Sequence, residues 1–211
     1  TSATRTRAPK ASSARTRREN AARHGSGSRG ISVSVIADPA RRGQTLAEFA
    51  LATLPRLWNE VAESAGLARD SPPHRLEWEC FGLYACVRGL VAAGGFNRET
   101  AAAVDALHER VLEAWAAEDP ATLDARRART AERYAEYGTL GQDGGAAGAA
   151  TVTRRLGEAC ARHLAASHAE NAADTPSARG PEIRFGDLAE LVGSIHEALV
   201  EGAAEAVRLA T

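Results

Sequence analysis

The chain has 211 residues, 44% of them hydrophobic and 5% aromatic, and a formal net charge of −1. No uncharged apolar run comes near the roughly 18 residues that cross a bilayer as a helix, which excludes a protein built on such spans. Three cysteines are too few for the framework of a disulfide-stapled secreted scaffold. The composition therefore favours a soluble domain without a transmembrane segment.

The near-zero net charge conceals two oppositely charged parts. Residues 1 to 42 carry ten basic side chains and two acidic ones, whereas residues 43 to 211 carry sixteen basic and twenty-five acidic ones. The first 30 residues contain no Leu, Ile, Val or aromatic residue, so they can bury nothing that offsets the entropy of ordering. We predict a disordered basic arm and linker over residues 1–37, followed by an alanine-rich helical bundle over residues 38–211.

Three roles are open for the basic arm. Its arginines can neutralise the phosphates of a nucleic acid or the head groups of an anionic surface. The arm also has the Arg-rich, Ser/Thr-rich and acid-poor composition of an organellar transit peptide, which would replace the cytoplasmic location that we otherwise expect. The third alternative is a solubilising leader without a partner. The arginines expected to make anionic contacts are Arg5, Arg7, Arg15, Arg17 and Arg18.

Residues 31–36 alternate apolar and polar side chains, which is the pattern of a β-strand. A lone strand leaves its backbone hydrogen-bonding groups unpaired. The segment therefore either pairs with a copy of itself in a dimer or forms an extended linker, and we favour the linker.

Six helices are predicted from start signals and from apolar residues repeated at i+3 and i+4. Asp38 before Pro39 starts the first helix, in which Pro55 predicts either a kink or a division into two shorter helices. Asp119 before Pro120 is the clearest boundary, and Gly138 stands where it can end the helix that follows. We expect the helix over residues 72–94 to be central, a loop over residues 139–150 and a polar linker over residues 170–181.

Alanine makes up 47 of the 93 hydrophobic residues, whereas Leu, Ile, Val and Phe together number 37. Such a thin aliphatic core requires either close packing of helices through small residues or association with another chain. We therefore expect a protein partner or a homo-oligomer. The predicted fold class is all-α, a five- to six-helix bundle with a disordered basic N-terminal arm.

Cysteine and histidine offer one candidate metal site. Cys160 and His163 are three residues apart on one face of the fifth helix, and Zn²⁺ binds thiolate and imidazole ligands. Further ligands would have to come from His108, His196 or Cys80 on other helices. Neither CxxC nor HExxH occurs in the chain, and the alternative is a small core cysteine beside a hydrogen-bonded histidine. No cofactor is predicted.

The Gly-rich segment before the fifth helix is a candidate anion site. Backbone amides at a helix N-terminus attract anions, and two arginines follow closely. The nucleotide-binding fingerprints GxGxxG and GxxxxGK[ST] are both absent. Residues 151–164 are also a candidate DNA-recognition helix, although the preceding helix ends further upstream than the turn of a helix-turn-helix motif allows. The residues of this anion site are Gly144, Gly145, Thr151, Arg154 and Arg155.

The sequence contains no catalytic motif. Glu77 and Glu79 stand beside Cys80 near the start of the second helix, where we expect surface carboxylates that complement the helix dipole. We therefore expect a non-enzymatic interaction or adaptor module whose basic arm contacts an anionic partner. The alternatives are a helical-bundle metal-binding protein or enzyme that uses inward-facing His and Cys, and a DNA-binding regulator that acts through residues 151–164.

Overall fold

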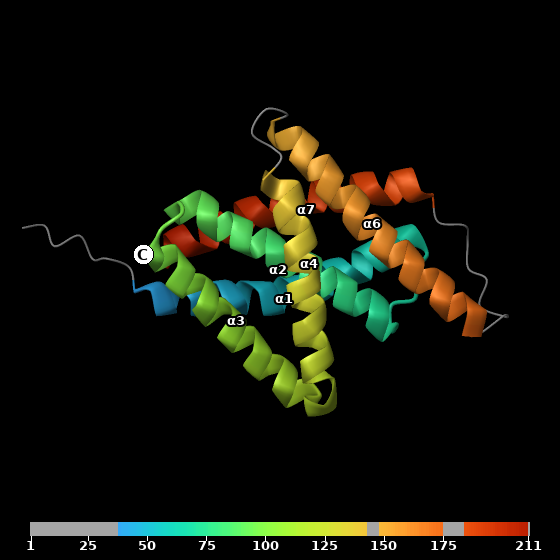
Figure 1. Cartoon of the computed structure of the whole chain (residues 1–211), viewed down its shortest axis with the longest axis horizontal. Coiled ribbons are helices and arrows are strands. Elements are labelled where there is room, and N and C mark those ends of the chain that lie inside the picture. The colour runs from blue at the N-terminus through green and yellow to red at the C-terminus, as the bar shows by residue number, and fades with distance from the viewer. Residues whose placement is uncertain (1–37, 143–147, 175–183, 211) are drawn as a thin grey trace, which may run out of the picture. The chain divides into compact units, whose positions relative to one another are not determined.

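The computed structural model describes residues 38–142, 148–174 and 184–210, and every regular element in these ranges is helical (Figure 1). The all-α prediction is confirmed, with six α-helices and one short 3-10 helix in the described ranges. The arm predicted over residues 1–37 and the alternating segment 31–36 lie outside them. The elements are α1 (Pro39–Ala65), α2 (Pro72–Gly94), α3 (Arg98–Glu118), η1 (Pro120–Thr122), α4 (Leu123–Gln142), α6 (Ala149–Asp174) and α7 (Phe185–Leu209).

Helix α1 begins at the predicted signal. The Asp38 carboxylate accepts a hydrogen bond from the backbone amide of Ala40 at 3.0 Å, and Gly66 ends the helix in the left-handed conformation with φ of 66°. Pro55 lies inside the helix, which continues without a break. The alternative of two shorter helices is therefore wrong, because one missing N–H donor is outweighed by the apolar face that α1 buries on both sides of Pro55.

Helix α4 does not end at Gly138, as the sequence predicted, but continues to Gln142. The preceding residue, Tyr137, is fully buried, and its carbonyl accepts a hydrogen bond from the Tyr84 hydroxyl at 2.9 Å. Leu140 also packs against the core. These tertiary contacts outweigh the low helix propensity of glycine. The predicted loop is shortened at both ends, since α6 begins at Ala149, and α6 also extends into the predicted polar linker, to Asp174.

Helix α2 is central, as predicted. It packs against each of the other α-helices in the described ranges, most extensively against α7. Trp78 of α2 is fully buried, and its indole N–H donates to the Leu54 carbonyl of α1 at 2.9 Å. Helix α4 lies at the periphery, since only Arg133 and Tyr137 of its residues are buried. In the described part of the chain, none of the helices has the combined length and apolar character that crossing a membrane requires.

Small residues bring the helix backbones close together. A Cβ atom at Gly89 of α2 would lie 2.6 Å from the Cβ of Ala203 in α7. At Gly157 of α6, a Cβ would collide with the Ala189 carbonyl oxygen of the same partner helix. Two of the most extensive helix contacts, α2 with α7 and α6 with α7, therefore depend on glycine at the crossing point.

Candidate functional site

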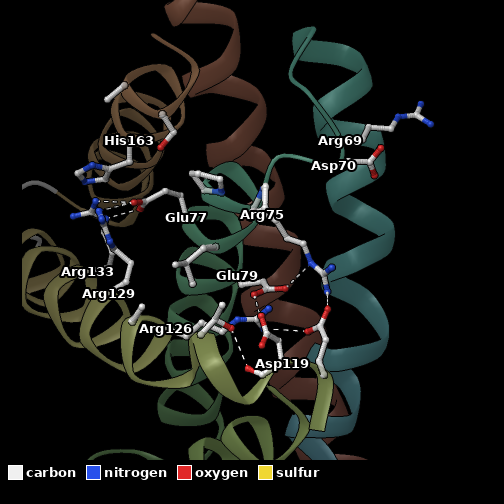
Figure 2. A pocket seen from close by; sticks show the side chains of 18 residues that line it. Arg69, Asp70, Arg75, Glu77, Glu79, Asp119, Arg126, Arg129, Arg133 and His163 are labelled. Carbon is white, nitrogen blue, oxygen red and sulfur yellow. Dashed lines mark hydrogen bonds and ion pairs between the residues drawn. The ribbon is translucent and has the colours of Figure 1, made fainter. Parts of the chain in front are cut away.

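A pocket of about 810 Å³ lies between α2, the end of α3, α4 and α6 (Figure 2). Eleven of its eighteen described lining residues have charged or imidazole side chains. The charged and imidazole side chains come from helices and turns far apart in the sequence and converge here. They are Arg69, Asp70, Arg75, Glu77, Glu79, Glu118, Asp119, Arg126, Arg129, Arg133 and His163.

The first ion-pair group, which we call the Glu77 cluster, consists of Glu77, Arg129 and Arg133. Arg133 donates from Nε at 2.6 Å and from Nη2 at 2.8 Å to the two carboxylate oxygens of Glu77, and Arg129 donates from Nη1 at 2.9 Å. The spacing of four residues places both arginines on one face of α4. Burial lowers the pKa of Arg133, but the hydrogen bonds and charge of Glu77 outweigh this effect and raise it.

The Glu77 cluster corrects a prediction. Glu77 and Glu79 were expected to be surface carboxylates, but they are only 4% and 7% exposed. Helix α4 covers this face of α2 and supplies the arginines that compensate the buried charge. A buried carboxylate with a two-pronged arginine partner is well satisfied and held in one orientation.

The second group, the Glu79 cluster, consists of Glu79, Arg75, Arg126 and Glu118. Arg75 donates to Glu79 at 2.9 Å and lies 3.1 Å from Glu118, which is also paired with Arg126 at 3.1 Å. The Arg126 guanidinium stacks over the ring of Trp115 at 5.2 Å from its centroid. Burial raises the pKa of Glu79, and this effect outweighs the attraction of Arg75 and Arg126.

His163 connects α6 to this network. Its Nε2 is 2.6 Å from a carboxylate oxygen of Glu136, and the same carboxylate lies 3.9 Å from Arg133. Figure 2 shows Arg129, Arg133 and His163 gathered on one side of Glu77, and Arg75 and Arg126 around Glu79. The histidine that the sequence offered as a metal ligand is therefore a hydrogen-bonded member of the pocket wall.

The two walls of the pocket differ in charge. The wall from α4 and α6 contributes Arg126, Arg129, Arg133, His163 and Ser167, and no carboxylate among its described lining residues. The opposite wall, from α2, α3 and the turn after it, contributes most of the acidic side chains. The α4–α6 wall can therefore donate several hydrogen bonds to an anion, whereas buried Glu77 keeps its arginines in place.

The other proposed metal ligands lie apart from the pocket lining. His108 contacts the Tyr134 hydroxyl at 3.0 Å, His196 packs against the Phe81 ring, and Cys160 is fully buried in the core. Within the described ranges, no three His, Cys, Asp or Glu side chains form a group that could hold a metal ion. The structure thus does not bring Cys160, His163, His108 and His196 together, and it identifies no cofactor-holding group of this kind.

The predicted anion site is placed only in part. Thr151, Arg154 and Arg155 lie at the start of α6, where Arg154 pairs with Glu158, and none of them lines the pocket. Gly144 and Gly145 lie outside the described residues, as do the five arginines of the arm that were expected to make anionic contacts. The candidate DNA-recognition segment, residues 151–164, is the first part of α6.

Sequence reasoning missed the pocket although its parts were visible. The signal was the combination of a segment rich in arginine and poor in aliphatics, Arg126 to Arg133, with two carboxylates on a helix that is apolar over much of its circumference. Comparisons of the chain with protein-family models, with curated proteins and with solved structures found no match.

Proposed function

We propose that the chain is a binding module that holds a small ligand with a carboxylate or phosphate group in the pocket between α2, α4 and α6. The observation that carries the proposal is that Glu77 has two arginine partners, of which Arg133 alone satisfies both of its carboxylate oxygens. Arg133 satisfies the buried carboxylate with two hydrogen bonds, and Arg129 adds one more from a side chain that is 40% exposed. Arg129 therefore has N–H donors left for a ligand.

The size and the rigidity of the pocket support this proposal. Small-molecule sites in proteins commonly have volumes of about 300 to 1,000 Å³, a range that includes this pocket. A guanidinium group matches the geometry of carboxylate and phosphate oxygens, and one that is already oriented loses less entropy on binding. The Glu77 cluster supplies such orientation for Arg129.

The role expected for the basic arm is a separate proposal. An arm that carries Arg5 to Arg18 can add contacts to a nucleic acid, an anionic surface or a protein partner, as an adaptor would. The two proposals can be tested separately, because deletion of residues 1–30 removes the basic arm and leaves every residue that lines the pocket.

The test of the pocket uses acetate and inorganic phosphate as probes, titrated into the full chain at about 0.15 M ionic strength and followed by calorimetry, because charges more than about 8 Å apart are then largely screened from each other. We expect saturable binding to the wild type. Arg129→Gln should weaken it at least about tenfold, because a hydrogen bond from a charged donor contributes about 1.5–3 kcal/mol. The fold is retained in this variant, since Arg133 still satisfies Glu77.

Arg127→Gln is the matched control. Arg127 is an exposed arginine of the same helix that pairs with Asp124 and does not line the pocket. Its substitution removes the same charge and is expected to change the affinity by less than about twofold at the ionic strength used. Equal affinity of the wild type and Arg129→Gln for both probes would show that the pocket is not the binding site.

A further inference from the structure

A second, smaller hollow of about 100 Å³ adjoins the charged residues of the first pocket. Its lining is apolar over most of its extent and comes from α1, α2 and α3. Leu51 and Pro55 line it from α1, Leu83 from α2, and Ala114 and Trp115 from α3. We call it the apolar hollow.

The hollow and the pocket share one edge. Arg75, Glu79 and Glu118 line both of them and are the charged residues among the described lining of the hollow. The side chains of Arg75 and Glu118, which pair at 3.1 Å, are each 41% exposed. Trp115 of the hollow is also in contact with Arg126 of the pocket, through its ring face. The two spaces are therefore adjacent halves of one surface, divided by a partly exposed ion pair.

We propose that the apolar hollow is the second half of the ligand site, and that the ligand is a short amphiphile with an anionic head and an apolar tail. The head lies against Arg126 and Arg129, and the tail enters the hollow past Arg75 and Glu118. This proposal rests on the proposed function of the pocket and adds the chemical class of the ligand.

The volume of the hollow sets the length of the tail. An apolar cavity of about 150 Å³ in another protein holds a benzene molecule, so a hollow two thirds as large fits about three or four methylene groups. Water binds weakly in such a site, because apolar walls offer it few hydrogen-bond partners. A hydrocarbon group gains about fourfold in affinity for each methylene group that it buries.

The test is a homologous series of linear carboxylates, from acetate through butanoate and hexanoate to octanoate, titrated into the full chain by calorimetry. The head group is constant in the series, so only the tail changes. We expect the affinity to rise about fourfold per methylene group up to a tail of about four carbons, and then to level off when the hollow is full.

Ala114→Leu fills the hollow from α3 and Leu51→Phe narrows it from α1, where both residues are only partly buried. In each variant the ratio of hexanoate to acetate affinity should fall towards one. Ala117→Leu is the control, since Ala117 is exposed on the same helix as Ala114 and does not line the hollow. It is expected to keep the wild-type ratio.

The possible outcomes separate the two proposals. If acetate binds but longer tails bind no better, the pocket keeps its function and the amphiphile is rejected. If no member of the series binds and phosphate does not bind either, both proposals fail. A gain with tail length that both Ala114→Leu and Leu51→Phe leave intact also rejects the hollow as the site of the tail. A concentration-dependent dimer that Ala114→Leu dissociates would assign the hollow to a second copy of the chain instead.

Discussion

Replacement of Glu77 by Gln tests whether the Glu77 cluster holds α4 against α2. The substitution conserves shape but removes the charge that two arginines neutralise. Arg133, whose side chain is 6% exposed, would then be a buried cation with its strongest partner lost. Breaking a buried ion pair by removing one member costs about 3–5 kcal/mol. Arg133 keeps Glu132 at 2.9 Å and Glu136 at 3.9 Å, so we expect a value near the lower end, about 3 kcal/mol.

The assay is urea denaturation of the wild type and Glu77→Gln, followed by far-UV circular dichroism and tryptophan fluorescence. In a thermal melt of a domain of this size, a loss of 3 kcal/mol in the free energy of unfolding corresponds to a fall in Tm of roughly 6–12 °C. Glu63→Gln is the control, because the pair of Glu63 with Arg69 is exposed and should contribute less than about 1 kcal/mol. A loss below about 1 kcal/mol for Glu77→Gln would refute the reasoning, and a double variant with Arg133→Met should recover most of the stability.

Three further predictions concern packing, pH and thiol reactivity. Gly157→Ala should destabilise the fold by about 1–3 kcal/mol in thermal melts because its Cβ meets the backbone of α7, whereas Gly138→Ala, with open space around it, should stabilise α4 by about 0.5–1 kcal/mol. Burial lowers the pKa of His196 to about 3 in the fold, below its unfolded value, so its contribution to stability is complete above about pH 6.5 and is lost as the pH falls towards 3. The free energy of unfolding of the wild type should therefore fall between pH 7 and pH 4 by roughly 3 kcal/mol more than that of His196→Leu, as measured by urea denaturation. Parallel pH profiles of the two proteins would contradict this. Burial raises the pKa of Cys80 and Cys86 to about 12, so neither should react with a thiol reagent until denaturant is added.

The sequence predicted those parts of the fold that are encoded locally. Asp38 before Pro39 and Asp119 before Pro120 are caps whose carboxylates accept hydrogen bonds from backbone amides two residues later, so they can be recognised without a structure. The end of α4 could not be predicted in this way, because the burial of Tyr137 overrides the low helix propensity of Gly138.

The candidate site could not be predicted for the same physical reason. Glu77 reads as an ordinary carboxylate in the first turns of a helix, and its partners Arg129 and Arg133 follow 52 and 56 residues later. The spacing of apolar residues in α2 does not indicate which other helix covers the face that carries Glu77. The arginines of α4 are visible in the sequence, but their charge balance depends on a helix pairing that only the tertiary structure defines.

The attachment of α4 has a consequence for its motion. Tyr137 is the one apolar side chain that α4 buries fully among its described residues. Helix α4 also contacts α2 through the ring of Tyr134 against Tyr84 and through the ion pairs of Arg129 and Arg133 with Glu77. A helix held in this way detaches in a partial opening that leaves the remaining core intact. We expect the amide protons of α4 to exchange with solvent at a lower opening free energy than those of α2, and at a still lower one as salt is added. Each such excursion dismantles one wall of the pocket, so an occupant that bridges α4 and α2 would slow hydrogen exchange along the whole of α4.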